Sequence, residues 1–98
     1  MKRDEILSTA SSLITGDRAK QYGNPNTMFS KIGSLWSAYL EVEITAVDVA
    51  HMMALFKIAR EQCGKHSDDN AIDACGYLAL GAEMSEQDDL PDGMEREW

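Results

Sequence analysis

One segment, residues 45–61 (TAVDVAHMMALFKIARE), limits what this chain can fold into. Thr45 followed by Asp48 forms the S/T-x-x-D/E pattern of a capping box, and neither glycine nor proline interrupts the roughly four turns that follow. Apolar residues lie almost all round this helix, which is typical of the most buried helix of a domain. We therefore expect a central helix that ends at Gly64, where a left-handed conformation can stop it.

A second helix should begin only a few residues later, capped by Ser67 or Asp68 and running to about Met84. Its acidic residues gather in the first turn, where the helix dipole favours them. Because the connection is so short, the two helices should pack as an antiparallel hairpin. The residues expected to pack along the second helix are Ile72, Cys75, Leu78, Leu80 and Ala82.

Two earlier segments also show helical periodicity. Residues 4–15 carry apolar pairs and end before Gly16, which is placed like a helix C-cap. A longer helix, capped by Asn26 or Thr27, should run to about Leu40, because apolar residues recur along one face. These residues are Phe29, Ile32, Leu35, Trp36 and Tyr39.

The sequence thus predicts an all-α fold, a compact bundle of about four helices that includes the antiparallel hairpin. The length of 98 residues allows one small domain, over residues 1–84, and we expect an acidic, flexible tail over residues 85–98. Any sizeable pocket would lie between helices or between subunits. So small a chain with so apolar a helix should bury surface against a copy of itself, and we expect a homo-oligomer.

The formal charge of −8 argues against direct binding to nucleic acid or to an anionic membrane. Two cysteines are too few for a disulfide framework, the first residues have no apolar signal-peptide core, and no apolar run could span a bilayer. A cytoplasmic location is the expectation.

The hairpin brings charged residues together. Reflection across a turn near Lys65 sets Lys57 opposite Asp73, and Glu61 opposite Asp69. Along the second helix, Asp69, Asp73 and Tyr77 follow one another at intervals of four residues and form one polar stripe. Arg60 is within reach of its start.

Two interpretations of this stripe stay open. In the structural one, Asp69 caps the helix and Asp73 pairs with Lys57, which fixes helix register and adds little stability. In the functional one, Asp69 and Asp73 hold Mg²⁺ with waters and substrate phosphates, while Lys57 and Arg60 neutralise phosphate oxygens. Zinc is disfavoured, because Cys63 and His66 have no second ligand pair of tight spacing.

The loop GDRAKQYGNPN, residues 16–26, is a second candidate. Arg18 offers a cation, Tyr22 a stacking surface and Gly23 a backbone that a ligand can approach closely. The alternative is an ordinary connector between helices, because the loop resembles neither a P-loop nor a GxGxxG turn.

Four sequence blocks carry a resemblance to a known family. They are R-x-x-x-Y-G-(D/N)-P over residues 18–25, F-x-x-I-x-x-L-W-S-A-Y-L over 29–40, I-T-x-x-D-V-A-x-M-M-x-x-x-K-I-A-R over 44–60 and D-N-x-x-D-x-x-G-Y over 69–77. Together they resemble a family of small helical proteins, encoded mainly by phages and prophages, that is a domain of unknown function. That family is similar to one called a nucleotide-modification-associated domain. If the chain is phage-encoded, its compartment is the cytoplasm of the bacterial host.

More remotely, the arrangement is similar to the MazG-like all-α nucleoside triphosphate pyrophosphohydrolases, which use Mg²⁺ held by acidic residues. Only Asp69 and Asp73 have a counterpart in that group, and its paired E-x-x-E motif is absent here. The resemblance therefore favours binding over turnover, and leaves open whether the protein is an enzyme.

We expect a phage-type protein that binds a nucleotide or another phosphorylated small molecule. Lys57 and Arg60 would contact phosphate, Tyr22 or Tyr77 the base or sugar, and Asp69 and Asp73 would bind Mg²⁺ or orient Lys57. Hydrolysis of a phosphoanhydride is the enzymatic version of this function. The alternative is a non-enzymatic interaction protein for host takeover or counter-defence, whose acidic surface binds a basic host protein.

Overall fold

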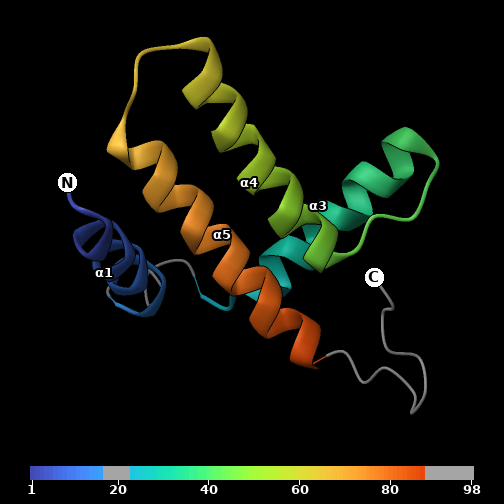
Figure 1. Ribbon diagram of the computed structural model, residues 1–98. Coiled ribbons are helices and arrows are strands. Elements are labelled where there is room, and N and C mark those ends of the chain that lie inside the picture. Colours follow the sequence, from blue (N-terminus) through green and yellow to red (C-terminus); the bar gives the residue numbers. More distant parts are fainter. Residues whose placement is uncertain (17–22, 88–98) are drawn as a thin grey trace, which may run out of the picture.

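Four helices, and no strand, make up residues 1–16 and 23–87, the parts of the chain that the computed structural model describes (Figure 1). The helices are α1 (Arg3–Thr15), α3 (Pro25–Leu40), α4 (Ala46–Cys63) and α5 (Asp68–Gln87). The all-α prediction is confirmed. Helix α5 continues three residues past the predicted domain end at residue 84, and residues 88–98 lie outside the described parts.

The predicted hairpin of α4 and α5 is present (Figure 1). At the start of α4, the hydroxyl of Thr45 accepts from the amide of Asp48 at 3.1 Å, and the Asp48 carboxylate accepts from the amide of Thr45 at 3.0 Å. This capping box satisfies two amides that the helix itself leaves unbonded. At its other end Gly64 has φ −126° and ψ −165°. The expected left-handed conformation is wrong, because the chain leaves α4 in extended geometry.

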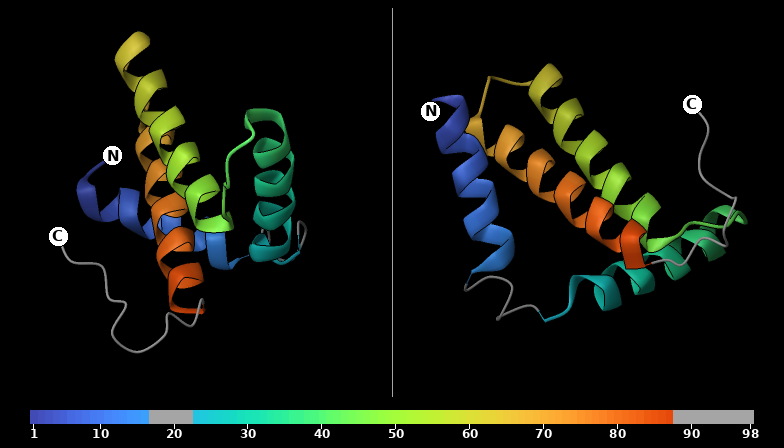
Figure 2. Two further views of the ribbon diagram at one scale, coloured as in Figure 1. Left: turned by 90° about the vertical axis from the view of Figure 1, so that its right-hand side faces the viewer. Right: turned by 60° about the horizontal axis from the view of Figure 1, so that its bottom comes forward.

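Helix α5 packs against both α4 and α1, whereas α3 packs against α4 (Figure 2). The main core cluster lies around the N-terminal half of α4 and contains Phe29, Val47, Val49, Ala50 and Met84. Trp36 packs against this cluster from α3, as its apolar periodicity suggests.

The return of the chain from α3 to α4 depends on a close approach between Gly33 of α3 and the backbone of Ile44. A Cβ atom at Gly33 would lie 2.7 Å from the carbonyl oxygen of Ile44, so a side chain there would collide with backbone. The hydroxyl of Ser37 accepts from the Ile44 amide at 2.7 Å, which holds this connection against α3. Glu41 ends α3 in the left-handed region, with φ 58°. These contacts fix the N-terminal end of α4, and the core residues that it carries, against α3.

Helix α4 carries four of the eight buried hydrophobic residues of the described parts, as expected of the most buried helix, but its C-terminal half is open to solvent. Leu55 is 63% exposed and Phe56 52%. Figures 1 and 2 show this half beside α5 and away from α3, so only the face toward α5 is covered. On α5, Ile72 is buried as predicted, whereas Leu78 is 49% exposed and Ala82 also faces solvent. None of the described helices is long and apolar enough to cross a membrane.

Candidate functional site

Lys57 and Asp73 form the ion pair that the hairpin reflection predicts. The Lys57 Nζ lies 2.9 Å from Oδ2 of Asp73, and the two side chains are only 15% and 28% exposed. Lys57 belongs to α4 and Asp73 to α5, and these two helices pack against each other. A cation and a carboxylate thus meet at the edge of the core, partly shielded from water.

A polar cleft of about 690 Å³ lies beside this pair, between the C-terminal end of α4 and the N-terminal end of α5. Three cationic residues line it, Lys57, Arg60 and Lys65, against two carboxylates, Asp69 and Asp73. Because Asp73 is already paired with Lys57, the remaining lining charge is positive on balance. The first turn of α5 also borders the cleft, and a helix N-terminus carries partial positive charge. The cleft is therefore locally cationic, although the whole chain carries a net negative charge.

An apolar pocket of about 330 Å³ adjoins the polar cleft. It lies among α1, α3 and α5, and two aromatic rings line it, Phe29 and Tyr77, whose centroids are 6.1 Å apart. Leu13, Lys57 and Asp73 line both spaces. The ion pair therefore stands where an aromatic-lined pocket meets a cationic cleft.

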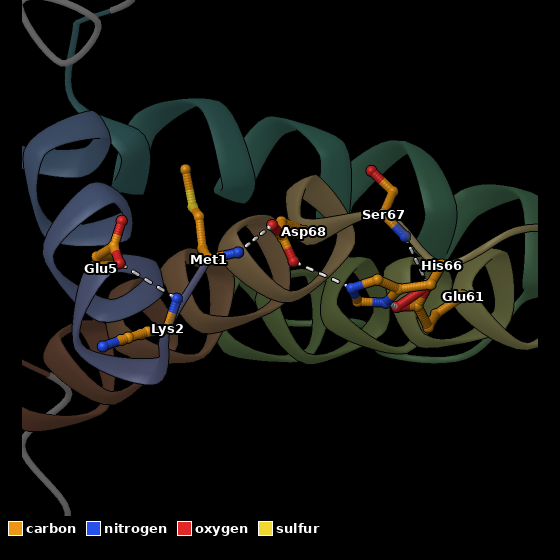
Figure 3. A network of polar contacts seen from close by, with 7 residues as sticks. All are labelled: Met1, Lys2, Glu5, Glu61, His66, Ser67 and Asp68. Atoms are coloured by element: carbon orange, nitrogen blue, oxygen red, sulfur yellow. Dashed lines mark hydrogen bonds and ion pairs between the residues drawn. The ribbon is translucent and has the colours of Figure 1, made fainter.

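The turn that borders the cleft is held by a cluster of polar contacts (Figure 3). His66 places Nδ1 2.7 Å from Oε2 of Glu61 and Nε2 3.0 Å from Oδ1 of Asp68. The amide of Ser67 donates to Oε1 of Glu61 at 2.9 Å. The Asp68 carboxylate also accepts from the amino group of Met1, at 2.9 Å, which joins the start of α1 to the start of α5. The starts of α1 and α5, the end of α4 and the turn between α4 and α5 are thus tied together at this end of the molecule.

These contacts shift the acidity of the groups that make them. Hydrogen bonds to Glu61, and then to Asp68, raise the pKa of His66 above its usual 6.5. The amide of Ser67 contributes most to lowering the pKa of Glu61 below its usual 4.5. The amino group of Met1, followed by His66, lowers the pKa of Asp68. All three shifts favour the charged form of the group, so the cluster is strongest when His66 is protonated and both carboxylates are ionised.

The structure brings most of the predicted site residues together. Lys57, Arg60, Asp69 and Asp73 all line the polar cleft, and Tyr77 lines the adjoining apolar pocket. Arg18 and Tyr22 lie outside the described residues.

Sequence reasoning missed other contributors to the site. Lys65 belongs to the predicted turn but lines the cleft as a third cation. Asn70 is 8% exposed and also lines the cleft. The carboxylate of Glu61, which the reflection sets opposite Asp69, is used by His66 and Ser67. The offset of five residues between Glu61 and His66 across a helix end is a signal that could have suggested this contact.

The metal predictions rest on few donors. Across residues 1–16 and 23–87, no group of three or more His, Cys, Asp or Glu side chains is arranged to hold a metal ion. Asp69 and Asp73 supply two carboxylates, and one of these is engaged with Lys57. A Mg²⁺ ion at these two carboxylates would need further oxygen ligands from water or substrate phosphate, so the predicted Mg²⁺ site stays a prediction.

Comparison with known proteins places the chain among phage sequences. Residues 5–85 match the model of a family described as "Domain of unknown function (DUF6378)". The chain is 39% identical over 95 residues to the Gene 55 protein of Mycobacterium phage D29, an alignment that covers 97% of this chain and 62% of that protein. It is 40% identical over 96 residues to the Gene 55 protein of Mycobacterium phage L5, with 95% of this chain and 61% of that protein covered.

The chain thus spans less than two thirds of the length of these phage relatives. No solved structure matches it. The predicted resemblance to a phage family of unknown function is confirmed, whereas the remote similarity to MazG-like pyrophosphohydrolases stays a prediction.

Proposed function

Since the chain belongs to this phage domain family, whose description names no activity, we propose from the site itself that it binds a nucleotide or another phosphorylated small molecule. The observation that carries the proposal is the position of the Lys57–Asp73 pair, where the cationic cleft meets the aromatic-lined pocket. A ligand with an anionic end and a flat or apolar end fits two such neighbouring spaces. A nucleotide has both ends.

The phosphate end of the ligand belongs in the polar cleft. Arg60 offers a planar fork of donors that suits phosphate oxygens, and Lys65 adds a mobile point charge from the turn. The backbone amides in the first turn of α5 supplement these side chains. Because the whole chain has a formal charge of −8, an anion is attracted only where such local cations outweigh the acidic background. Binding should therefore weaken as salt is added.

The base or sugar belongs in the apolar pocket. Phe29 and Tyr77 present aromatic surface, and Tyr77 adds a hydroxyl that can hydrogen-bond a polar edge. Gly23 also lines this pocket, whereas the predicted contact of Tyr22 with the base or sugar lies outside the described residues. Each of the two spaces has a volume within the usual range for small-molecule sites.

Lys57 and Asp73 have an orienting role in this proposal. Asp73 holds the Lys57 ammonium at the junction of the two spaces, where it can reach a phosphate without crossing the apolar pocket. A Mg²⁺ ion that arrived with the phosphates would compete with Lys57 for Asp73. We therefore propose binding rather than turnover as the basic activity, with phosphoanhydride hydrolysis as a further prediction.

Calorimetric titration and thermal shift test the proposal. Nucleoside triphosphates, the matching nucleosides and inorganic pyrophosphate would each be added, with and without Mg²⁺. We expect triphosphates to bind more tightly than either the nucleoside or pyrophosphate, because only they fill both spaces. A ligand at a hundredfold excess over its dissociation constant adds about 2.7 kcal/mol of stability.

Matched variants sharpen this test. Arg60→Ala and Lys65→Ala should weaken triphosphate binding by about tenfold or more each, whereas Lys31→Ala, an exposed change of the same charge on α3, should not. If no phosphorylated ligand shifts the melting temperature, the proposal is wrong. The acidic interaction protein then becomes the better hypothesis.

A further inference from the structure

We propose that the exposed face of α4 is a contact between two copies of this chain, which pair antiparallel across a two-fold axis. The face is a stripe of four residues, Met52, Leu55, Phe56 and Ala59, that recur at helical spacing on the side of α4 away from α5. We call it the α4 stripe. Leu55 is 63% exposed and Phe56 52%, so two large side chains are left in water next to each other. Monomeric proteins rarely expose contiguous apolar surface of this kind without using it.

The distribution of charge favours a second copy as the occupant. Helix α5 carries five acidic residues and no basic one, whereas α4 carries two of each sign and α3 a single lysine. Of the eleven large hydrophobic side chains exposed in the described residues, seven lie on α3 and α4. Two chains of charge −8 repel each other, so they can associate only through a face without net negative charge. The α4 stripe is such a face, and a basic partner would be drawn to α5 instead.

The stripe is also self-complementary in size. An axis that passes between Leu55 and Phe56 sets Leu55 of one copy opposite Phe56 of the other, and Met52 opposite Ala59. At the centre of the contact, the large side chains of Leu55 and Phe56 then meet each other. On either side, Met52 meets the small side chain of Ala59, which lets the two helices approach closely. A two-fold contact uses the same patch twice, as most homodimers do.

Charge at the ends of the stripe selects the antiparallel direction. Asp48 lies near the N-terminal end of α4 and Arg60 near its C-terminal end, where its guanidinium carbon is 5.9 Å from the centre of the Phe56 ring. Antiparallel pairing brings Asp48 of one copy within about one helical turn of Arg60 of the other. Parallel pairing would set each of these charges against its own kind.

The first expectation is that the whole chain forms a dimer in solution. Light scattering or sedimentation should give a mass twice that of one chain. Phe56→Lys should give a monomer of unchanged helical content. Leu78→Lys makes the same change at an exposed position on α5 and should remain a dimer. Lysine is chosen because it puts a charge in the middle of the contact while lowering the net negative charge of each chain, so loss of the dimer cannot be due to stronger overall repulsion between the chains. A monomeric wild-type chain, or dissociation caused equally by both variants, would overturn the proposal.

A spin label on Cys63 tests the direction of pairing, in a Cys75→Ala background that leaves one labelled site. The axis described above sets Cys63 opposite position 48 of the other copy, fifteen residues away along the helix. The two labelled Cα atoms would then lie roughly 24 Å apart, from a rise of 1.5 Å per residue and a helix separation of 8–10 Å. Parallel pairing would place them only about 10 Å apart, and a distance that short would refute the antiparallel arrangement.

Discussion

Replacing both members of the Lys57–Asp73 pair should restore most of the stability that either single change removes. At 2.9 Å and an effective dielectric constant of about 20, the gross attraction between the charges is roughly 6 kcal/mol. Desolvation of two side chains that are 15% and 28% exposed offsets most of it, so the net worth of the pair is small. What costs stability is one charge left without the other.

For Lys57→Met we expect a loss of about 1–3 kcal/mol, because Asp73 remains at the edge of the core without its cation. The loss should fall below the 3–5 kcal/mol of a fully buried pair, since water still reaches the carboxylate. The double variant Lys57→Met with Asp73→Leu should lie within about 1 kcal/mol of the wild type, because two apolar side chains can pack in the seam.

Urea denaturation followed by circular dichroism measures all four free energies of unfolding, and the double-mutant cycle gives the coupling energy. Lys31→Met, which removes an exposed lysine on α3, controls for the change in net charge. Additive losses in the double variant, with no coupling, would refute the reasoning. The same proteins also separate scaffold from site, because a double variant that folds and still binds triphosphate would remove both residues from the proposed ligand contacts.

Three further predictions concern the α4–α5 turn, two glycines and the cap of α4. Because the folded-state pKa of His66 is raised, its contribution to stability should be complete below about pH 6.5 and lost as the pH rises through the higher value. The pKa of Glu61 is lowered, so its contribution should be present above about pH 4.5 and lost as the pH falls through the lower value. Urea midpoints of wild type and His66→Ala should therefore differ most between these limits and converge in alkali, and a difference independent of pH would contradict this. Gly33→Ala should cost about 1–3 kcal/mol, since its Cβ would meet backbone at 2.7 Å, whereas Gly64→Ala should change stability by less than about 1 kcal/mol in the same urea series. A large loss for Gly64→Ala would mean that the left-handed conformation is the true one. Thr45→Ala removes the N-cap of α4 and should cost about 1 kcal/mol in thermal denaturation, with Thr45→Ser as the control that keeps the hydroxyl.

The sequence predicts the helices and the hairpin well because both depend on local signals. Capping residues, the absence of glycine and proline, and apolar periodicity determine where α4 begins and ends. Once two helices are joined by a short turn, helical geometry leaves little freedom in which residues face each other, so the Lys57–Asp73 pair follows from counting outward from the turn. Closer to the turn the same counting fails. Glu61 is drawn to His66 and Ser67, because residues that leave the helix can fold back onto its last carboxylate.

The burial of α4 could not be predicted in the same way. An apolar residue has the same transfer free energy whether it is covered by its own chain or by another molecule, so an all-round apolar helix indicates only that something covers it. Which side the chain itself covers depends on where α1 and α3 lie, and no local pattern encodes that placement. Phe56 and Val49 are alike as apolar positions in sequence, yet one is 52% exposed and the other fully buried. The half of α4 left open is also the half that lines the polar cleft, so a second copy on the α4 stripe would fix Arg60 from one side while a phosphate contacts it from the other. If both proposals hold, triphosphate binding should tighten with dimerisation, because Arg60 would then be ordered before the ligand arrives.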